Sequence, residues 1–236
     1  MSRLRYYLPI LGYHRIGRFQ SDHVPTVTPE AFERQLSFIA RHRYQVVGLD
    51  VVADALERGT RLPRRQTVIT FDDGYEETYT IAWPLLKRFG FSSTVFITPG
   101  EIGTPGFMTW EQAVEMSRDG VLIGSHTMHH SYLPSVPEEK LPYELVESKR
   151  VIEAHLHLPV EYISYPIGGF TAQVQEIVRQ AGYRVACTTN RLSSTPGIDR
   201  FALRRVKVTE RDGAGPSLWM KLSGYYDLFR QLKAPN

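Results

Sequence analysis

Short apolar runs alternate with amphipathic stretches along the whole chain, and this alternation limits the folds that the chain can adopt. The expected strands are YYLPILGYH, YQVVGL, TVITFDD, SSTVFIT, VLIGSH, EYISYP, RVACTT and FALRRVKV. Most of these runs are apolar at consecutive positions, which is typical of parallel strands that are covered by helices. The alternation therefore predicts an α/β protein built on a parallel sheet.

Signals for the starts and ends of helices occur between the expected strands. In TPEAFERQLSFIARH, Thr28 is the expected N-cap and Pro29 the first helical residue. The stretches EETYTIAWPLLKRFG and FTAQVQEIVRQAG end on Gly90 and Gly182, and glycine favours the left-handed conformation that ends many helices. A further amphipathic helix is expected at about residues 215–232.

The composition is that of an ordinary soluble protein, with 42% hydrophobic and 22% charged residues, and residues 1–236 are predicted to form a single domain. A net charge of +3 gives no electrostatic reason to expect nucleic-acid binding. The single cysteine, Cys187, excludes an intrachain disulfide and thiolate metal sites. No apolar segment is long enough to be a transmembrane helix, and Pro9 interrupts the apolar stretch near the N-terminus. No signal peptide is therefore expected, and the predicted location is cytoplasmic, with an extracytoplasmic location as the alternative if the sequence is truncated. No feature indicates an oligomeric state.

Polar residues follow several of the expected strands, and their positions favour a closed barrel over an open sheet. His14, Asp72-Asp73, His126 and Tyr165-Pro166 all lie at the carboxyl ends of expected strands. In a parallel barrel these ends share one rim, where active sites are built. The glycine patterns of a dinucleotide-binding fold and of a phosphate-binding loop are absent from the sequence.

The segment TFDDG places two adjacent carboxylates, Asp72 and Asp73, at the end of an apolar strand, and a cation would offset their repulsion. In the later segment GSHTMHH, His126 and His130 are spaced so that one helical turn would put both imidazoles on one side, although His129 could substitute. Two imidazoles and one carboxylate form a divalent-metal site with open positions. One aspartate would bind the cation, and the other would be placed to accept a proton.

The sequence from TVITFDDG to SHTMHHSYL resembles the polysaccharide deacetylase domain, also called the NodB-homology domain or carbohydrate esterase family 4. TFDDG is similar to the first motif of that family, and HTMHH is similar to its H-S/T-x-x-H motif. The resemblance covers most of residues 7–208 and implies a distorted (β/α) barrel of about seven parallel strands with metal-dependent deacetylase activity. It also implies that Asp72 is the catalytic base and that Asp73, His126 and His130 bind the metal.

The third motif of the family is only partly present. ISYPIGGF resembles the YPYG variant of one branch, with Ile167 in the place of the usual tyrosine. Because the backbone N–H at that position stabilises the oxyanion, an isoleucine can fill the same role. Ser164 stands where many relatives have an arginine that orients the base. Arg204 or Arg205, on the last expected strand, is the candidate replacement.

The C-terminal Leu-x-His motif, which supplies the general acid in the family, is missing, because no histidine follows His157. The segment GYH ends on His14 and resembles the YH of relatives that deacetylate poly-N-acetylglucosamine. First and last strands are neighbours in a closed barrel, so His14 is predicted to protonate the leaving amine. Tyr165, Pro166 and Trp110 are expected at the substrate site, although an aromatic residue at a helix start is more often a packing residue.

These observations predict a hydrolase that converts the N-acetyl group of an N-acetylglucosamine-containing glycan, or of a glycan precursor, to an amine and acetate. Zinc suits the expected ligands, and cobalt, nickel and iron use the same donors. A small-amide or cyclic-imide hydrolase of the same superfamily and a non-catalytic glycan-binding protein are the alternatives. A third alternative is a metal-dependent phosphodiesterase of unrelated ancestry, but this sequence has no glycine loop that would bind a phosphate. Poly-N-acetylglucosamine, chitin oligomers, peptidoglycan and lipid- or nucleotide-linked precursors all fit as substrates.

Overall fold

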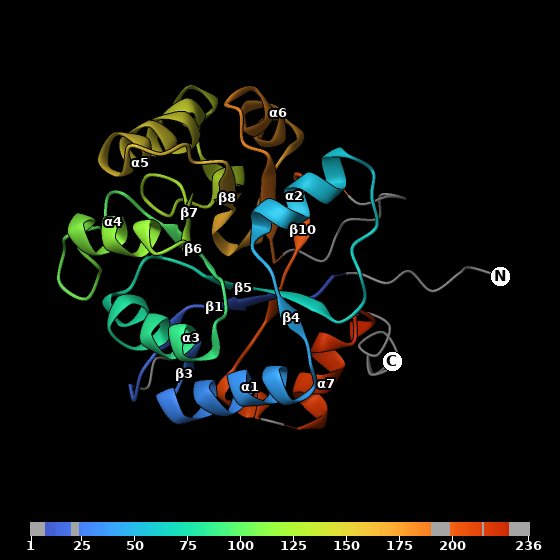
Figure 1. The fold of residues 1–236 in the computed structure, drawn as a ribbon. Coiled ribbons are helices and arrows are strands. Elements are labelled where there is room, and N and C mark those ends of the chain that lie inside the picture. The colour runs from blue at the N-terminus through green and yellow to red at the C-terminus, as the bar shows by residue number, and fades with distance from the viewer. Residues whose placement is uncertain (1–7, 20–23, 190–198, 214, 227–236) are drawn as a thin grey trace, which may run out of the picture.

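The structure is a computed structural model that describes residues 8–19, 24–189, 199–213 and 215–226, and it shows a ring of parallel strands surrounded by helices (Figure 1). The strands are β1 Ile10–Tyr13, β2 Arg15–Ile16, β3 Thr26–Val27, β4 Gln45–Val46, β5 Gln66–Phe71, β6 Thr94–Ile97, β7 Leu122–Ser125, β8 Tyr162–Ser164, β9 Val185–Thr188, β10 Leu203–Arg204 and β11 Val206–Lys207. The α-helices are α1 Pro29–Arg41, α2 Leu49–Glu57, α3 Trp83–Phe89, α4 Trp110–Arg118, α5 Ser148–Leu156, α6 Ala172–Gln180 and α7 Pro216–Leu222. Short π-helical turns, Thr78–Ala82 and Tyr143–Glu147, precede α3 and α5.

The order of the strands shows how the ring closes. The order is β10-β9-β8-β7-β6-β5-β1-β11, and the pairs in it are parallel. β10 and β11 are two halves of one segment, residues 203–207, which pairs with β9 at one end of the order and with β1 at the other. In the described part of the chain, seven segments therefore surround a nearly closed barrel, and β4 pairs additionally with β5. The expected barrel of about seven parallel strands is confirmed.

Most helix boundaries follow the signals in the sequence. The side chain of Thr28 accepts a hydrogen bond from the backbone N–H of Ala31, and Pro29 is the first residue of α1. Gly90 follows α3 with a φ of 65°, in the left-handed region that a helix C-cap requires. The helices α2 and α5 begin without a side-chain N-cap of the kind that marks α1.

The C-terminal helix is shorter than the expected 215–232. α7 ends at Leu222, and Gly224 has a φ of 76°, which cannot continue a right-handed helix. The part of the expected helix beyond residue 226 lies outside the described residues.

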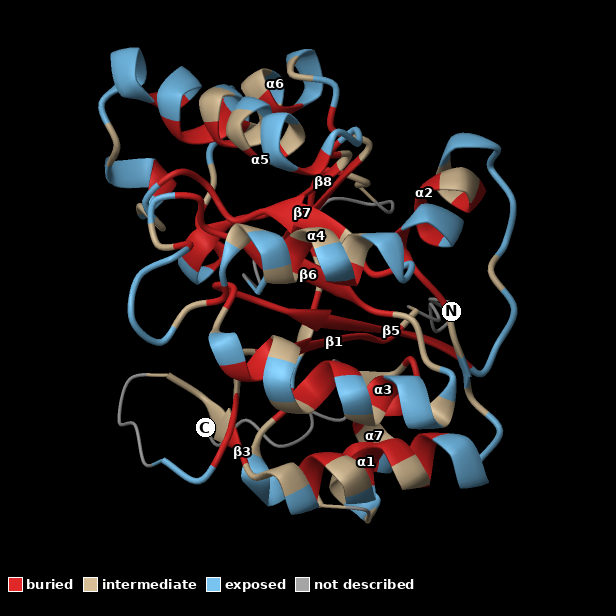
Figure 2. Ribbon diagram, turned by 60° about the vertical axis from the view of Figure 1, so that its left-hand side comes forward, coloured by how far each residue is buried: buried red, intermediate tan, exposed pale blue. Residues whose placement is uncertain are grey.

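Alternation along the strands divides their side chains between the interior of the barrel and the layer under the helices. Inside, Ile10, Val68 and Phe96 form an apolar cluster together with Val52 of α2, which covers the amino-terminal end of the barrel. A Cβ on Gly124 of β7 would lie 2.6 Å from the Phe96 ring, so glycine makes room for this interior side chain. Figure 2 shows the buried strands in red beneath helices whose outer faces are exposed.

The inward positions become polar at the carboxyl ends of the strands. The register between β1 and β5 places His14 next to Asp72, directly after the two strands end. His126 follows β7, and Arg205 lies between β10 and β11. The fold therefore brings these four side chains from separate parts of the sequence to one rim of the barrel.

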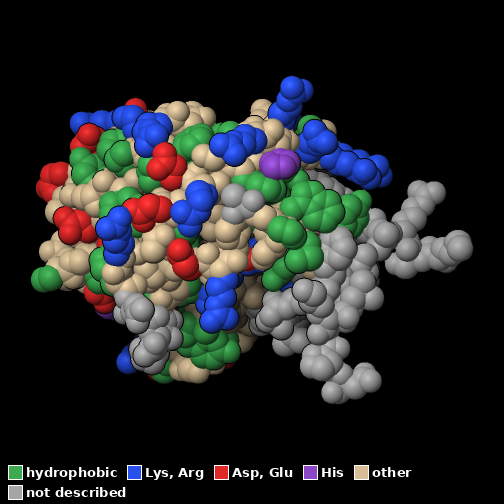
Figure 3. All heavy atoms as spheres, turned by 90° about the horizontal axis from the view of Figure 1, so that it is seen from below, with side chains coloured by type: hydrophobic (Ala, Val, Ile, Leu, Met, Phe, Trp, Pro, Cys, Tyr) green, Lys and Arg blue, Asp and Glu red, His purple; other side chains and the backbone are tan. Residues whose placement is uncertain are grey.

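Charged side chains of both signs are spread over the surface. Figure 3 shows Lys and Arg interspersed with Asp and Glu on the face that is seen from below. Among the described residues of this face there is no continuous basic stripe of the kind that tracks a nucleic-acid backbone.

Candidate active site

The three side chains that were expected to bind a metal lie together at the carboxyl rim. Asp73, His126 and His130 each offer a ligand atom, and these atoms lie within 4.8 Å of one another. The Oδ1 of Asp73 is 3.5 Å from the Nε2 of His126 and 3.3 Å from the Nε2 of His130. Two imidazoles and one carboxylate that face a common point are a donor set that zinc and related metals use.

The environment of these residues fits a bound cation. The Oδ1 of Asp73 is buried and has no hydrogen-bond partner in the described part of the chain. Burial and the negative charge of Asp72 raise the pKa of Asp73 to about 6. A cation would remove this penalty, because it stabilises the ionised carboxylates. Burial also lowers the pKa of His126 to about 3 and lowers that of His130, so both rings keep the neutral form that binds metals.

The orientation of His126 is fixed from the neighbouring strand. Its Nδ1 lies 2.7 Å from the backbone carbonyl oxygen of Ser164, at the end of β8. A carbonyl oxygen only accepts, so Nδ1 carries the proton and Nε2 keeps a free lone pair towards Asp73.

The segment between the two metal-cluster histidines is not helical, so the expected single turn of helix was wrong. Thr127 and His130 have φ values of 66° and 56°, and the loop curls instead of continuing as a helix. It still places the His126 and His130 rings 4.8 Å apart between centroids. Asp73 also has a positive φ, 75°, and strained residues of this kind often gather at functional sites.

Glu144 holds this loop in place, and sequence reasoning missed it. Its Oε2 accepts the backbone N–H of His129, and its Oε1 accepts the Nδ1–H of the same residue and the hydroxyl of Ser131, each at 3.0 Å. The His129 ring therefore pairs with Glu144, and His130 completes the metal cluster. No local pattern marks Glu144, because its partners are 13 and 15 residues away in the sequence.

Arg205 is the arginine that contacts the proposed base. Its Nη1 and Nη2 donate to the two carboxylate oxygens of Asp72, both at 2.6 Å. The same guanidinium donates to the hydroxyl of Thr70 at 3.1 Å and to that of Ser164 at 2.8 Å. Burial would raise the pKa of Asp72, but the charge of Arg205 and its hydrogen bonds hold it well below its usual range. Asp72 is therefore a carboxylate with a fixed orientation.

His14 lies beside Asp72 and outside the metal cluster. Its Nε2 is 3.8 Å from the Oδ2 of Asp72, and its side chain is 22% exposed, so the ring is within reach of solvent and of a bound molecule. The other ring nitrogen, Nδ1, is buried and has no partner among the described residues.

The comparison with known families agrees with this geometry. Residues 59–186 match the family described as Polysaccharide deacetylase, which is more than half of the chain. The chain belongs to the polysaccharide deacetylase family. The family that the two motifs indicated is confirmed, whereas the branch with the YH and YPYG motifs stays a prediction.

Curated relatives and solved structures resemble this polysaccharide deacetylase over most of its length. The Bacillus subtilis strain 168 protein YxkH, named as a polysaccharide deacetylase, is 31% identical over 202 residues, which are 86% of this chain and 71% of the relative. The poly-beta-1,6-N-acetyl-D-glucosamine N-deacetylase of Staphylococcus aureus strain MRSA252 is 23% identical over 216 residues, 86% of this chain and 73% of that protein.

Several solved structures share the fold. IcaB from Ammonifex degensii has a TM-score of 0.78 and 27% identity, covering 94% of this chain and 97% of its own. The deacetylase PplD of Streptococcus pyogenes, solved in complex with acetate, has a TM-score of 0.83 and 24% identity, covering 91% of this chain and 97% of its own. The likeness to PplD shows the fold alone.

The third motif of this polysaccharide deacetylase forms a tight turn at the rim. Ile167 has a φ of 57° and a side chain that is 71% exposed. Tyr165, expected at the substrate site, is instead fully buried; its hydroxyl donates to the carbonyl oxygen of Phe201. Pro166 is also buried. The expectation that these two side chains contact substrate was wrong, because both belong to the packing under the turn.

Trp110, the third residue expected at the substrate site, makes a packing contact of the kind that is more common for an aromatic residue at a helix start. It begins α4, and its ring stacks on His155 of α5 with centroids 3.9 Å apart and planes at 7°. The contact joins two helices on the outside of the barrel, which supports packing as the role of this tryptophan.

The α-helices in the described part of the chain have between 7 and 13 residues. None of the helices there combines the length and the apolar character that crossing a bilayer requires.

Proposed function

We propose that this chain hydrolyses the N-acetyl group of an N-acetylglucosamine-containing glycan to a free amine and acetate. The observation that carries the proposal is the Asp73–His126–His130 cluster next to the Asp72–Arg205 pair. The name of the Staphylococcus aureus relative, a poly-beta-1,6-N-acetyl-D-glucosamine N-deacetylase, supports an acetylated amino-sugar polymer as the substrate.

We assign Asp73, His126 and His130 as the residues that would hold a divalent metal, with zinc as the best fit to two imidazoles and one carboxylate. When bound, such a cation supplies Lewis-acid chemistry that polarises the acetyl carbonyl and makes water easier to ionise. The raised pKa of Asp73 and its unpartnered Oδ1 support this assignment.

The remaining residues divide the proton transfers between them. Asp72 accepts a proton from the attacking water while the oxygen of that water forms a bond to the acetyl carbon. Arg205 keeps Asp72 ionised and oriented. The backbone N–H of Ile167 stabilises the oxyanion, and His14 then donates a proton to the nitrogen as the carbon–nitrogen bond breaks.

Metal depletion and acetate release together test this function. The substrate panel contains β-1,6-linked N-acetylglucosamine oligomers, chitin oligomers, peptidoglycan and small amides. At least one glycan should release acetate. A chelator should abolish this release and zinc should restore it, because the metal would polarise the acetyl carbonyl and make water easier to ionise. Turnover of small amides alone would favour the small-amide hydrolase. Stoichiometric metal without turnover on any glycan would favour a non-catalytic glycan-binding protein.

His14→Ala should lower kcat by about 100-fold, because the leaving nitrogen loses its proton donor. The metal content should not change, since His14 lies outside the metal cluster. Steady-state kinetics and metal analysis of the same sample measure both quantities. A loss of metal would instead make His14 a ligand or a residue that the fold requires.

A further inference from the structure

A hollow of about 780 Å³ lies at the loop after β7 and takes no part in the proposed reaction. Tyr132, Ser135, Lys140 and Tyr143 are among its lining residues. A volume of this size falls within the range of about 300–1,000 Å³ that is typical of small-molecule sites. We propose that this hollow is a subsite for a second sugar residue of the glycan, next to the residue that is deacetylated. This inference rests on the proposed function and names where its polymer would bind.

The hollow lies beside the loop that carries the second metal-cluster histidine. His129 lines the hollow, and the next residue, His130, contributes its ring to the metal cluster. The ring of Tyr132 lies against Gly169. A Cβ at residue 169 would come within 2.1 Å of that ring, so the contact requires glycine. Gly169 ends the turn that carries Ile167. Tyr132 therefore contacts both the hollow and the turn at the rim.

The lining has the chemistry that a pyranose ring needs. Tyr143 stacks on His129 with centroids 5.7 Å apart and planes at 19°, and its side chain is 53% exposed. Tyr132 is 45% exposed. Half-exposed aromatic rings can pack against the apolar C–H face of a sugar while their hydroxyls remain in water. Ser135 and Lys140 add a hydroxyl and an ammonium that can bind sugar hydroxyls.

The Tyr143→Ala variant tests the subsite. The measured quantity is the ratio of kcat/KM for a β-1,6-linked N-acetylglucosamine hexamer to that for 4-nitrophenyl acetate, an acetyl donor without a sugar. The ratio should fall about tenfold, because only the hexamer can reach the aromatic surface. Tyr143→Phe should keep most of the ratio, and Val146→Ala, an exposed residue outside the lining, is the matched control.

An unchanged ratio in Tyr143→Ala overturns the subsite. A binding measurement separates this result from a failure of the proposed reaction. The Kd of the hexamer is compared between Asp72→Asn and the double variant that also carries Tyr143→Ala. If the wild type releases no acetate from any glycan of the panel, the proposed reaction is wrong, and hexamer binding then decides the subsite. About tenfold weaker binding by the double variant supports a sugar subsite, and equal binding rejects it.

Discussion

Asp72→Asn should lower kcat for acetate release by about 10³-fold, because an amide cannot accept the proton of the attacking water. The substitution preserves the shape of the side chain. Asp72 is not one of the three residues of the metal cluster, so the metal content should stay close to that of the wild type. Kinetics on the most active glycan of the panel, with metal analysis of the same preparation, measure both effects.

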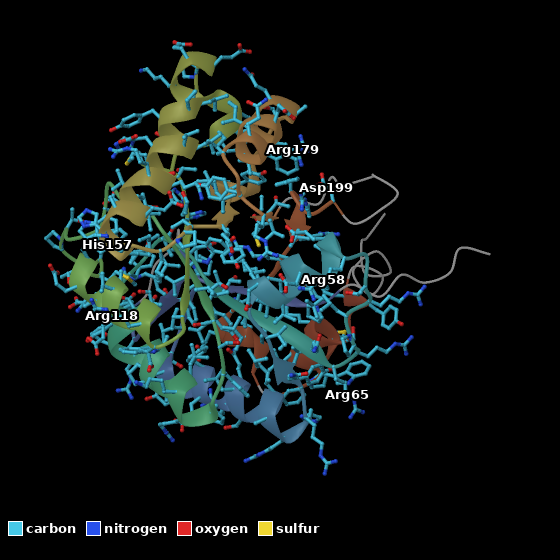
Figure 4. The ribbon with its side chains drawn as sticks, turned by 45° about the horizontal axis from the view of Figure 1, so that its top comes forward. Arg58, Arg65, Arg118, His157, Arg179 and Asp199 are labelled. Atoms are coloured by element: carbon cyan, nitrogen blue, oxygen red, sulfur yellow. The ribbon has the colours of Figure 1, made fainter. Side chains whose placement is uncertain are left out.

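The same substitution leaves the buried guanidinium of Arg205 without its negative partner, and a loss of stability must be separated from a loss of catalysis. Breaking a buried ion pair costs about 3–5 kcal/mol. Activity is therefore compared well below the Tm of the variant. His157→Asn is the matched control, since His157 is exposed and lies on the outside of the molecule (Figure 4). If the Asp72→Asn variant is folded, contains metal and has activity within tenfold of the wild type, Asp72 is not the base.

The strands and the metal cluster could be predicted from the sequence because they depend on local patterns. Each of the expected apolar runs contains an observed strand, and the ends of parallel strands must share one rim. Asp73, His126 and His130 follow such ends, so the sequence alone predicts that they lie near one another.

Other features depend on contacts between distant residues and could not be predicted in this way. The loop that aligns His126 with His130 is held by Glu144, and the fit of Tyr132 depends on Gly169. Tyr165 was assigned to substrate from its motif alone, whereas its burial is decided by Phe201 and other neighbours.

The choice between Arg204 and Arg205 is decided by strand alternation once the direction of one neighbouring side chain is known. Leu203 is apolar and packs in the interior cluster with Ile10 and Val68. Strand alternation then turns Arg205 inward as well and turns Arg204 to the opposite side. The break between β10 and β11 at Arg205 could not be foreseen, because it arises where one segment pairs with β9 and then with β1.

Arg205→Met should lower the free energy of unfolding by about 3–5 kcal/mol, because it leaves Asp72 buried without its cation. It should also change the pH dependence of kcat. Burial raises the pKa of Asp72, and the Arg205 guanidinium lowers it. With the guanidinium gone the pKa must rise, so less of the base is ionised at a given pH. Activity should then fall as the pH decreases through the raised pKa and should recover at higher pH.

Denaturant unfolding and kcat as a function of pH test these two effects on Arg205→Met, Arg205→Lys and Arg204→Met. Arg205→Lys keeps the positive charge without the two-pronged hydrogen bond. Its kcat should therefore decrease towards low pH as in the wild type, while the maximal kcat is lower. Arg204→Met removes a cation from the same segment without removing the Asp72 pair. A variant that only disturbed the fold would lower stability and kcat without changing the pH at which kcat decreases. An unchanged pH dependence in Arg205→Met would therefore show that another group keeps Asp72 ionised.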